Sequence, residues 1–473
     1  MNNTESRKII IIGCGASGMA AALSASVYCR DILILERNAV AGRKITATGN
    51  GKCNFTNLHV TPADFRGSNP KQSYEIYTAF DCQDAIRFFR QIGVPVYNRN
   101  NSGYCYPHSE QASSLRDCLD NALYRRGVSV IYETLADNIS YECTSNGSTL
   151  FTVSALNTGT GNRTEYVSER LIIACGGMAA PCFGTDGRLY PVIEGLGHRL
   201  VPSLPALTSL ILESPYLKKL DGVRRQALIR LYSSQRSGES PASAGLASNC
   251  KQKYPVGDVS QTDAPCYEPD TGTLLYSEQG EIIFSQKGIS GIPVMNASRY
   301  AAHCISDHDV WLTLDFCPDM SADELREYIE GLAQLTGGRG LKKLCAGLVG
   351  DKLLNVIFEH CNIKNSSDIS QEELSSQTRG LVNSLKNMAF RVLGTSDFEN
   401  AQCSTGGVPL SEICPDSMES KLVRGLYFTG EVLDTDGKCG GYNLQWAWTT
   451  GMIAGACAGG GSFDKNKLFE TKI

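Results

Sequence analysis

A short glycine pattern near the start of the chain constrains the fold more than any other feature. The β-branched run from Lys8 to Ile12 leads directly into GCGASG, where Gly13, Gly15 and Gly18 occupy the positions G-x-G-x-x-G, and an alanine-rich segment follows. An uninterrupted apolar run is typical of a buried parallel strand, and alanines favour a helix. The pattern therefore predicts a strand–turn–helix unit that opens a parallel α/β sheet.

A second apolar run ends in an acidic residue. Ile32 to Leu35 precedes Glu36, which follows the last glycine at about the 20-residue spacing of a ribose-binding acid. In such a unit the middle glycine lets a pyrophosphate approach, and the helix start offers free N–H groups. The unit predicts a dinucleotide site, with a glycine-rich structural turn as the alternative. The expected contacts are Gly13, Gly15, Ala16, Ser17, Gly18, Glu36 and Arg37.

The next loop favours FAD over NAD. Residues Ala41 to Asn57 are rich in Gly, Thr and Asn and include several basic residues. Such a loop can follow a pyrophosphate outward and hydrogen-bond a ribityl chain, which NAD lacks. A solvent-exposed basic loop is the alternative. The expected contacts are Arg43, Lys44, Asn50, Cys53 and Asn54.

Length and charge limit the classes of protein. A chain of 473 residues predicts two or three domains. The net charge of -5, without a basic patch or tail, gives no support for a nucleic-acid or anionic-membrane partner. The basic and apolar N-terminus could be mistaken for a signal peptide, but its glycines favour the strand–turn–helix unit. No apolar run is long enough for a bilayer, so we expect a cytoplasmic protein without a membrane span.

Cysteine and histidine patterns argue against a metal site. The 19 cysteines form no C-x-x-C pair, which zinc ribbons, iron–sulfur clusters and thioredoxin-like dithiols need. We expect reduced, buried thiols in a reducing compartment. The 6 histidines are scattered, with no metal constellation and no Ser/His/Asp order resembling a hydrolase.

Six motifs in a fixed order resemble a known family. They are GCGASG, TGNGKCNFTN, LIIACGGMAAPCFGTDG, GEIIFSQKGISG, CSTGGV and GEVLDTDGKCGGYNLQWAW. Together they resemble the BaiN/RdsA-type family of NAD(P)/FAD-dependent oxidoreductases over nearly the whole chain. The resemblance implies an α/β fold: a glutathione-reductase-type FAD-binding domain (ββα dinucleotide fold with a parallel sheet) built from both chain ends, with an inserted β-barrel-like plus helical domain.

The resemblance also gives roles to the C-terminal motif. Glu431 would bond the ribityl hydroxyls, and the amides from Gly441 to Leu444 would face the pyrimidine edge of the flavin, where a helix N-terminus stabilises the negative charge of the reduced ring. A glycine cap followed by tryptophans for core packing is the alternative. The expected contacts are Leu135 near the adenine, Cys175, Gly176, Gly177, Gly430, Glu431, Asp434, Gly441, Tyr442, Asn443 and Leu444.

We expect two domains. Residues 1–195 and 389–473 would form the FAD-binding domain, with strands at Val128 to Ile131, Phe151 to Ala155 and Leu171 to Ala174, the last closing the parallel sheet. Residues 196–388 would form the substrate or cap domain. Its alternating strand patterns are Ala227 to Tyr232, Glu281 to Phe284 and Trp311 to Phe316, and its amphipathic helices are Ala322 to Leu335 and Leu341 to Glu359. The polar stretch 233–272 is either a surface loop or a lid.

The family pattern is not complete. Where the family usually has Phe-Thr-His, this chain has Phe284, Ser285 and Gln286, and Ile292 separates a glycine from Pro293. No second complete nucleotide fingerprint is present, so NADH or NADPH would visit the flavin transiently. The candidate proton donors are Tyr104, Tyr106, His108 and Tyr442. For the first three, the alternative is that they only pack within a loop.

The expected function follows from the resemblance and from a cofactor site to which both ends of the chain would contribute. It is an FAD enzyme that passes hydride from NADH or NADPH to an electron-poor C=C of a small apolar substrate. Some family members are associated with steroid-like 3-oxo-4-ene compounds such as bile-acid intermediates. The alternatives are an FAD-dependent amine oxidase, since the family is also labelled aminoacetone oxidase-like, and a flavin-binding redox sensor without turnover.

Overall fold

The computed structural model describes residues 3–145, 147–235, 272–336, 341–363 and 371–471. Its contacts divide the chain into two compact units, residues 1–207 with 397–473, and residues 208–396. The boundaries expected from the sequence lay at 195/196 and 388/389. The strand Met388–Thr395 belongs to the second unit because it pairs with two strands there. Most of the polar stretch 233–272 lies outside the described residues.

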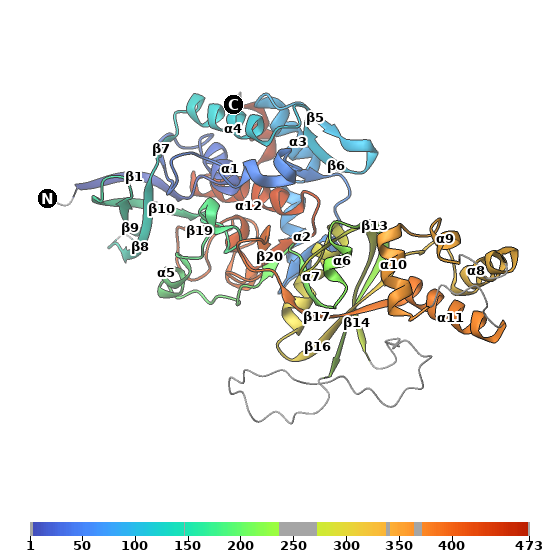
Figure 1. The fold of residues 1–473 in the computed structure, drawn as a ribbon. Coiled ribbons are helices and arrows are strands. Elements are labelled where there is room, and N and C mark those ends of the chain that lie inside the picture. Colours follow the sequence, from blue (N-terminus) through green and yellow to red (C-terminus); the bar gives the residue numbers. More distant parts are fainter. Residues whose placement is uncertain (1–2, 146, 236–271, 337–340, 364–370, 472–473) are drawn as a thin grey trace, which may run out of the picture. The chain divides into compact units, whose positions relative to one another are not determined.

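A mainly parallel sheet organises the first unit (Figure 1). Its order is β7-β2-β1-β10-β9-β8, and β19 also pairs with β10. The strands are β1 Asn3–Ile12, β2 Ile32–Leu35, β7 Ser129–Ile131, β8 Thr134–Cys143, β9 Thr149–Asn157, β10 Arg163–Ile173 and β19 Leu426–Phe428. Four of them, β7, β2, β1 and β19, join β10 in the parallel part, while β8 and β9 are antiparallel.

The strand expected to close the sheet is instead central. β10 lies beside β1 along its length, and on its other side it pairs first with β9 and then with β19. The expected edge position was wrong because β19, a short C-terminal strand, continues the parallel sheet beyond β10. This pairing places a C-terminal strand in the same sheet as the first strand, with β10 between them.

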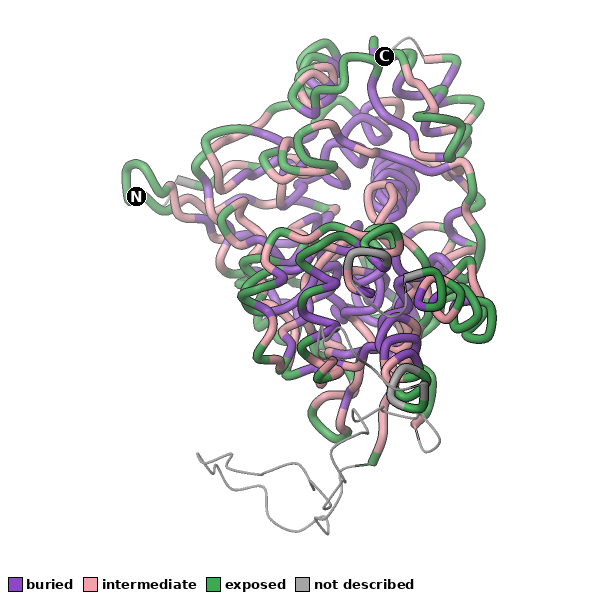
Figure 2. The backbone as a smooth tube through the Cα atoms, turned by 45° about the vertical axis from the view of Figure 1, so that its right-hand side comes forward, coloured by how far each residue is buried: buried purple, intermediate pink, exposed green. Residues whose placement is uncertain are grey.

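Two helices of the first unit pack closely against each other. They are α1 (Ala16–Ala25) and α12 (Tyr442–Ala458). A Cβ on Gly451 would lie 2.4 Å from the carbonyl oxygen of Ser17, and a Cβ on Gly455 would lie 2.0 Å from that of Ala21. Glycine is therefore required on α12 for this crossing. Figure 2 shows the buried backbone of each unit in purple, with green segments at the periphery.

Shorter elements complete the first unit. The helices are α2 Pro70–Ala79, α3 Cys82–Gln91, α4 Ala112–Arg125, α5 Tyr190–Gly195 and α13 Lys465–Glu470. The small sheets pair β3 Thr56–Asn57 and β5 Val96–Asn98 with β6 Tyr104–Pro107, β4 Phe65–Gly67 with β20 Thr435–Gly437, and β11 Pro205–Ala206 with β18 Cys403–Ser404.

The second unit contains a closed six-stranded barrel, which confirms the predicted fold class of an α/β domain with an inserted β-barrel-like unit. Its strands are β12 Leu210–Glu213, β13 Arg224–Gln235, β14 Thr273–Ser285, β15 Gly288–Ser290, β16 His308–Asp315 and β17 Met388–Thr395. Alternate residues of β13, namely Ala227, Ile229 and Leu231, are buried, as the strand pattern predicts.

Helices accompany the barrel. They are α6 Leu217–Leu220, α7 Ile292–Cys304, α8 Ala322–Thr336, α9 Leu341–Cys345, α10 Asp351–His360 and α11 Gln371–Asn387. The single helix expected from Leu341 to Glu359 was wrong, because α9 ends at Cys345 and α10 begins at Asp351. Gln286, which stands in the family's histidine position, donates its side-chain amide to Asp221 at 2.9 Å.

No helix in the described ranges is both long and apolar enough to cross a membrane. Every cysteine that the structure describes is a free thiol. Within the same residues, no group of three His, Cys, Asp or Glu side chains is placed to hold a metal ion.

Candidate dinucleotide site

The three glycines of the first loop differ in their surroundings. Gly13 has a φ of +103°, and a Cβ there would lie 2.5 Å from the carbonyl oxygen of Ala174. A Cβ on Gly18 would lie 1.9 Å from the carbonyl oxygen of Gly13. At Gly15, no described residue beyond the chain neighbours comes within 4 Å of the Cβ position. The protein's own packing requires Gly13 and Gly18, whereas the space at Gly15 suits a ligand that approaches the backbone.

Glu36 closes the same loop from the end of β2. Glu36 is 6% exposed, and its Oε2 accepts the N–H of Cys14 at 2.7 Å. Oε1 accepts the backbone and side-chain N–H groups of Asn38 at 2.8 and 2.7 Å. A carboxylate oxygen accepts about two hydrogen bonds, so within the described hydrogen bonds Oε2 keeps one acceptor position. The N–H of Thr134 donates to the Glu36 carbonyl, which brings Leu135 beside the acid.

Two arginines hold a second loop near the end of β2. Arg37 pairs with Asp186 at 2.8 Å, and the Arg43 guanidinium lies 5.9 Å from the ring centre of Phe183. These two guanidinium groups hold the segment around Phe183 and Asp186 next to the residues that follow β2. Asn50 is exposed on the loop that follows.

Glu431 lies at the centre of contacts from distant parts of the chain. Its Oε2 accepts the Lys44 ammonium at 2.8 Å, and its Oε1 accepts the N–H and the hydroxyl of Ser404 at 2.9 and 3.2 Å. A Cβ on Gly177 would lie 2.2 Å from the Ser404 hydroxyl oxygen. By the same count as for Glu36, Oε2 of Glu431 keeps one acceptor position within the described hydrogen bonds.

The first and last motifs touch each other. Gly430 has a φ of +76°, and a Cβ there would lie 2.6 Å from the Ser17 hydroxyl oxygen. The hydroxyl of Ser17 donates to the Thr429 carbonyl at 3.4 Å. The indole of Trp446 donates to the Gly430 carbonyl at 3.2 Å. The two glycine motifs, from opposite ends of the sequence, therefore lie against each other in the first unit.

The start of α12 offers polar groups to a ligand. Gly441 has a φ of +95°, and a Cβ there would lie 2.7 Å from the Thr56 carbonyl and 3.0 Å from Oδ1 of Asn54. That oxygen is buried and has no hydrogen-bond partner among the described residues. The N–H groups of Asn443 and Leu444, in the first turn of α12, have no partner inside the helix. A buried acceptor beside a helix N-terminus fits the polar edge of a bound ring.

Two of the expected contacts serve the protein's own backbone. Asp434 is buried and accepts the N–H of Ser68 at 2.9 Å. The side-chain amide of Asn443 accepts from the N–H and donates to the carbonyl of Gly437 at 2.8 and 3.0 Å. Both side chains fix the chain around β20, and their contact with a cofactor remains a prediction.

The four candidate proton donors are separated by the structure. The ring of Tyr104 lies against Gly440, where a Cβ would be 2.6 Å from Tyr104 and 3.1 Å from Tyr442. The hydroxyl of Tyr442 donates to a backbone carbonyl at 3.2 Å. Tyr106 is buried on β6, and His108 is exposed. Only Tyr104 and Tyr442 are brought to the turn that opens α12.

Cysteines near the site are kept protonated. Burial raises the pKa of Cys53 and of Cys175 to about 12. Burial also raises the pKa of Cys14, with a further contribution from the Glu36 carboxylate, and burial raises that of Cys403. Since the thiolate is the reactive form, these side chains act as packing groups.

Ser404 was missed by sequence reasoning. It lies in the CSTGGV motif, but a lone serine in a glycine-rich segment carries no chemical signal of its own. Asn57 was missed for the same reason, although its side-chain amide donates to the Gly440 carbonyl at 2.9 Å. Both act through contacts between residues far apart in sequence, which no local pattern shows.

A buried Ser–His–Glu network lies elsewhere in the first unit. His198 Nδ1 is 2.9 Å from Oε2 of Glu412, and Nε2 is 2.9 Å from the Ser420 hydroxyl oxygen. That oxygen also accepts the N–H groups of Leu422 and Val423 at 3.0 and 2.9 Å. Because both acceptor positions of the hydroxyl are filled and Ser420 is 5% exposed, the network supports the fold and is not arranged for nucleophilic attack.

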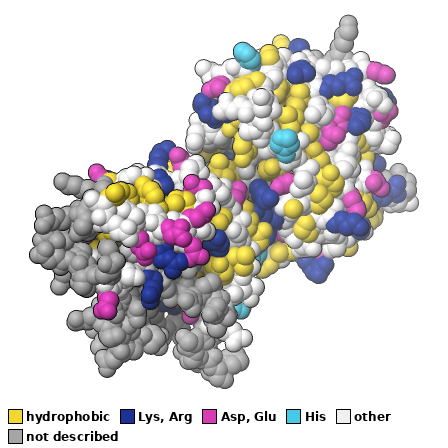
Figure 3. All heavy atoms as spheres, turned by 90° about the vertical axis from the view of Figure 1, so that its right-hand side faces the viewer, with side chains coloured by type: hydrophobic (Ala, Val, Ile, Leu, Met, Phe, Trp, Pro, Cys, Tyr) yellow, Lys and Arg dark blue, Asp and Glu magenta, His cyan; other side chains and the backbone are white. Residues whose placement is uncertain are grey.

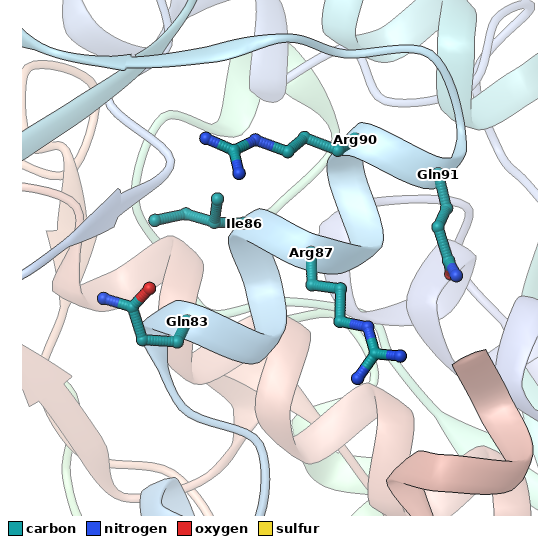
Figure 4. Close-up of a pocket in the computed structure, with 5 residues that line it drawn as sticks. All are labelled: Gln83, Ile86, Arg87, Arg90 and Gln91. Atoms are coloured by element: carbon teal, nitrogen blue, oxygen red, sulfur yellow. The ribbon is translucent and has the colours of Figure 1, made fainter.

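A surface pocket of about 500 Å³ lies along one helix of the first unit. All of its lining side chains come from α3 (Figure 4), namely Gln83, Ile86, Arg87, Arg90 and Gln91. None of them belongs to the expected site. The Arg87 guanidinium lies 4.0 Å from the ring centre of Phe469, and Gln91 donates to the Phe469 carbonyl at 3.0 Å.

Comparisons with known proteins agree with this geometry. The family model described as HI0933-like protein Rossmann domain matches residues 7–457. The 3-dehydro-bile acid delta(4,6)-reductase of Clostridium scindens is 31% identical over 95% of this chain and 98% of its own length. Proteins named ribosomal RNA dihydrouridine synthase are 26% identical over 95% of this chain, from Escherichia coli over 96% of its length and from Haemophilus influenzae over 97%. The resemblance found in the sequence is confirmed, and the chain belongs to the HI0933-like family of Rossmann-domain proteins.

Proposed function

We propose that this chain binds FAD in its first unit and, with NADH or NADPH as hydride source, reduces a C=C bond conjugated to a carbonyl in an apolar, steroid-like compound. The observation that carries the proposal is the meeting of two glycine–acid pairs, Gly15 with Glu36 and Gly430 with Glu431, in one site. Each acid keeps one acceptor position for a sugar or ribityl hydroxyl.

The residues present fit FAD along its length. The open position at Gly15 and the start of α1 would take the pyrophosphate. Glu36 and Leu135 would take the adenosine, and the pair of Lys44 and Glu431 would face the ribityl chain. The Oδ1 of Asn54, which is buried and has no hydrogen-bond partner among the described residues, would meet the polar edge of the ring together with the start of α12.

FAD, when bound, supplies a carrier that accepts a hydride from a nicotinamide and releases it to an acceptor carbon. The chain's own contribution is electrostatic and steric. The N-terminus of α12 places positive potential beside the ring edge that becomes negative on reduction. The glycines at 440 and 441 let the backbone come this close.

The substrate class rests on the relatives. The relative at 31% identity is named a bile acid delta(4,6)-reductase, and the two at 26% are named ribosomal RNA dihydrouridine synthases. A 3-oxo-4-ene and a uracil ring both contain a C=C bond conjugated to a carbonyl, so one site chemistry serves both. The higher identity favours the steroid-like compound. Among the described residues on the face drawn in Figure 3, basic and acidic side chains are interspersed and form no large basic patch. RNA binding would favour such a patch.

The deciding experiment follows the visible spectrum of purified protein. A flavin spectrum that NADH or NADPH bleaches without oxygen, and that a steroid 3-oxo-4-ene restores, is the expected result. Recovery with uridine-containing RNA and not with the enone would move the assignment to RNA. Bleaching by amines alone would support an oxidase, and a bound flavin that no donor reduces would support a redox sensor. Protein purified without flavin and unable to take up added FAD would contradict the proposal.

Tyr104 is the proposed proton donor to the carbon next to the substrate carbonyl. Its ring lies at the glycine turn that opens α12, while Tyr106 is buried on the same strand. Tyr104→Phe is expected to slow enone-dependent reoxidation by about 100-fold and to leave bleaching by the nicotinamide unchanged. Tyr106→Phe is the matched control, with reoxidation near the wild-type rate. Equal reoxidation rates in wild type and Tyr104→Phe would remove Tyr104 from this role.

A further inference from the structure

The hydrogen bonds around Glu431 form a closed ring through four segments of the chain. The N–H of Met178 donates to the Ser404 hydroxyl at 3.0 Å, which donates to Oε1 of Glu431 at 3.2 Å. Lys44 donates to Oε2 of Glu431 at 2.8 Å and to the carbonyl of Ala179 at 3.1 Å. Because Met178 and Ala179 are neighbours in sequence, the ring closes on itself.

The ring has little room to adjust. Ser404 is 2% exposed, and its backbone N–H also donates to Glu431 at 2.9 Å. A Cβ on Gly177 would lie 2.2 Å from the Ser404 hydroxyl oxygen and 2.7 Å from Oε1 of Glu431. Ser404 itself is held by β18, which pairs with β11. The position of the carboxylate is therefore fixed by packing as well as by hydrogen bonds.

The ring determines which polar groups of this region remain for a ligand. Lys44 has three ammonium protons, and the ring uses two of them. Oε1 of Glu431 accepts two hydrogen bonds and Oε2 accepts one from the described residues. One donor and one acceptor are left side by side, which suits the hydroxyls of a ribityl chain.

We infer that Ser404 and Lys44 are positioning residues that hold Glu431 for the cofactor, and that Ser404 controls how long FAD stays bound. The inference rests on the proposed function, because it assumes that FAD is the ligand of this site. Without the Ser404 hydroxyl, Glu431 loses a hydrogen bond and the N–H of Met178 loses its acceptor. The carboxylate then turns more freely, and ordering it on FAD binding costs conformational entropy.

The test compares Ser404→Ala with Thr405→Val. Thr405 is the next residue, is equally buried at 2% exposed, and uses its hydroxyl to accept the N–H of Leu204 at 3.1 Å, outside the ring. FAD release is measured by the fluorescence of freed flavin, and thermal unfolding is measured with and without FAD. Ser404→Ala is expected to release FAD about tenfold faster and to reduce the upward shift in unfolding temperature that FAD causes.

Thr405→Val is expected to lower both unfolding temperatures and to leave the FAD-induced shift at its wild-type size. A merely structural role for Ser404 would give that same pattern in Ser404→Ala, and this result would overturn the inference. If Ser404→Ala does not fold, Lys44→Met replaces it, with Lys52→Met as control, since Lys52 pairs with Glu110 on an exposed loop at 2.6 Å. Unchanged FAD release in Lys44→Met would then overturn the inference.

Failure of the inference and failure of the proposed function give different results. Wild-type protein that neither contains nor takes up FAD contradicts the proposed function. Wild-type protein that holds FAD, together with variants that hold it equally long, contradicts only the positioning role of the ring.

Discussion

The two glycine–acid motifs of the first unit are built in different ways. Glu36 hydrogen-bonds residues of its own strand–turn–helix unit, Cys14 at 22 residues' separation and Asn38 at 2. Glu431 hydrogen-bonds Ser404 at 27 residues' separation and Lys44 at 387. The first motif is complete once a local unit has folded, whereas the second exists only when the whole first unit is assembled.

This difference couples the cofactor to the fold. A ligand that contacts both motifs binds only the assembled unit, so it stabilises that unit by mass action. The contacts of α1 with α12 at Gly451 and Gly455 carry the same coupling, because they join the first motif to the helix that follows the second. Substitutions in the local motif and in the assembled motif should therefore have different effects on stability and on FAD binding.

The largest effect is expected at Gly18, with Gly15 as its counterpart. A Cβ on Gly18 would lie 1.9 Å from a backbone carbonyl oxygen, so Gly18→Ala should lower the free energy of unfolding by about 3 kcal/mol or more. Gly15→Ala meets open space, so its apoprotein should lose about 1 kcal/mol or less while FAD content falls sharply. Denaturant unfolding and flavin absorbance measure the two effects. A Gly15→Ala protein with full FAD content would show that the phosphates lie elsewhere.

The next prediction compares the two acids directly. Glu36→Ala and Glu431→Ala should each weaken FAD binding by at least about tenfold, because each removes a charged acceptor. Glu431→Ala should also cost the apoprotein about 2 kcal/mol, since Lys44 loses its partner in a largely buried place. Glu36→Ala should cost about 1 kcal/mol through the unsatisfied N–H of Cys14. FAD titration and urea unfolding of the apoproteins check both.

Either of two outcomes would break the comparison. Unchanged FAD content in both variants would overturn the assignment of the site. Equal stability losses would show that the second motif is no more dependent on assembly than the first.

The same difference explains what the sequence could predict. The strand–turn–helix unit from Gly13 to Glu36 could be predicted because its motif residues lie close together in sequence and each residue type has a known physical role at its position. The barrel could be predicted in part, since alternating buried residues along β13 indicate a strand. The second domain boundary, expected at 388/389, lies at 396/397 in the structure, because β17 pairs with β12 and β16. The ring of hydrogen bonds at Glu431 could not be predicted from the sequence, because Ser404 and Lys44 contact Glu431 only in the folded protein.

A smaller effect is expected from the network at His198. Burial lowers the pKa of His198 below its ordinary value of 6.5, against the opposing effect of Glu412. The folded protein thus binds this proton less readily than the unfolded chain, so the contribution to stability is full above pH 6.5 and is lost as the pH falls through the folded-state pKa. Burial raises the pKa of Glu412, but Arg199 and His198 outweigh it and the net shift is downward, which adds to the loss at still lower pH.

The unfolding temperature of the wild type should therefore fall between pH 7.5 and 5.5, by about a few degrees more than that of His198→Gln. His108→Gln, at an exposed position, is the control and should keep the wild-type slope. Parallel slopes for wild type and His198→Gln would mean that the network does not titrate in this range.

The smallest effect is expected on the exposed face of α3. Arg87 lies over the Phe469 ring at 4.0 Å, so Arg87→Ala should cost about 0.5 kcal/mol, and Arg90→Ala should cost less, as surface changes usually do. Neither should alter FAD content, because the pocket of Figure 4 contains no residue of the two motifs. Urea unfolding and flavin absorbance measure both effects. If either variant released FAD, then α3 would contribute to the assembled motif, and the dependence of Glu431 on the rest of the first unit would extend further than its hydrogen bonds reach.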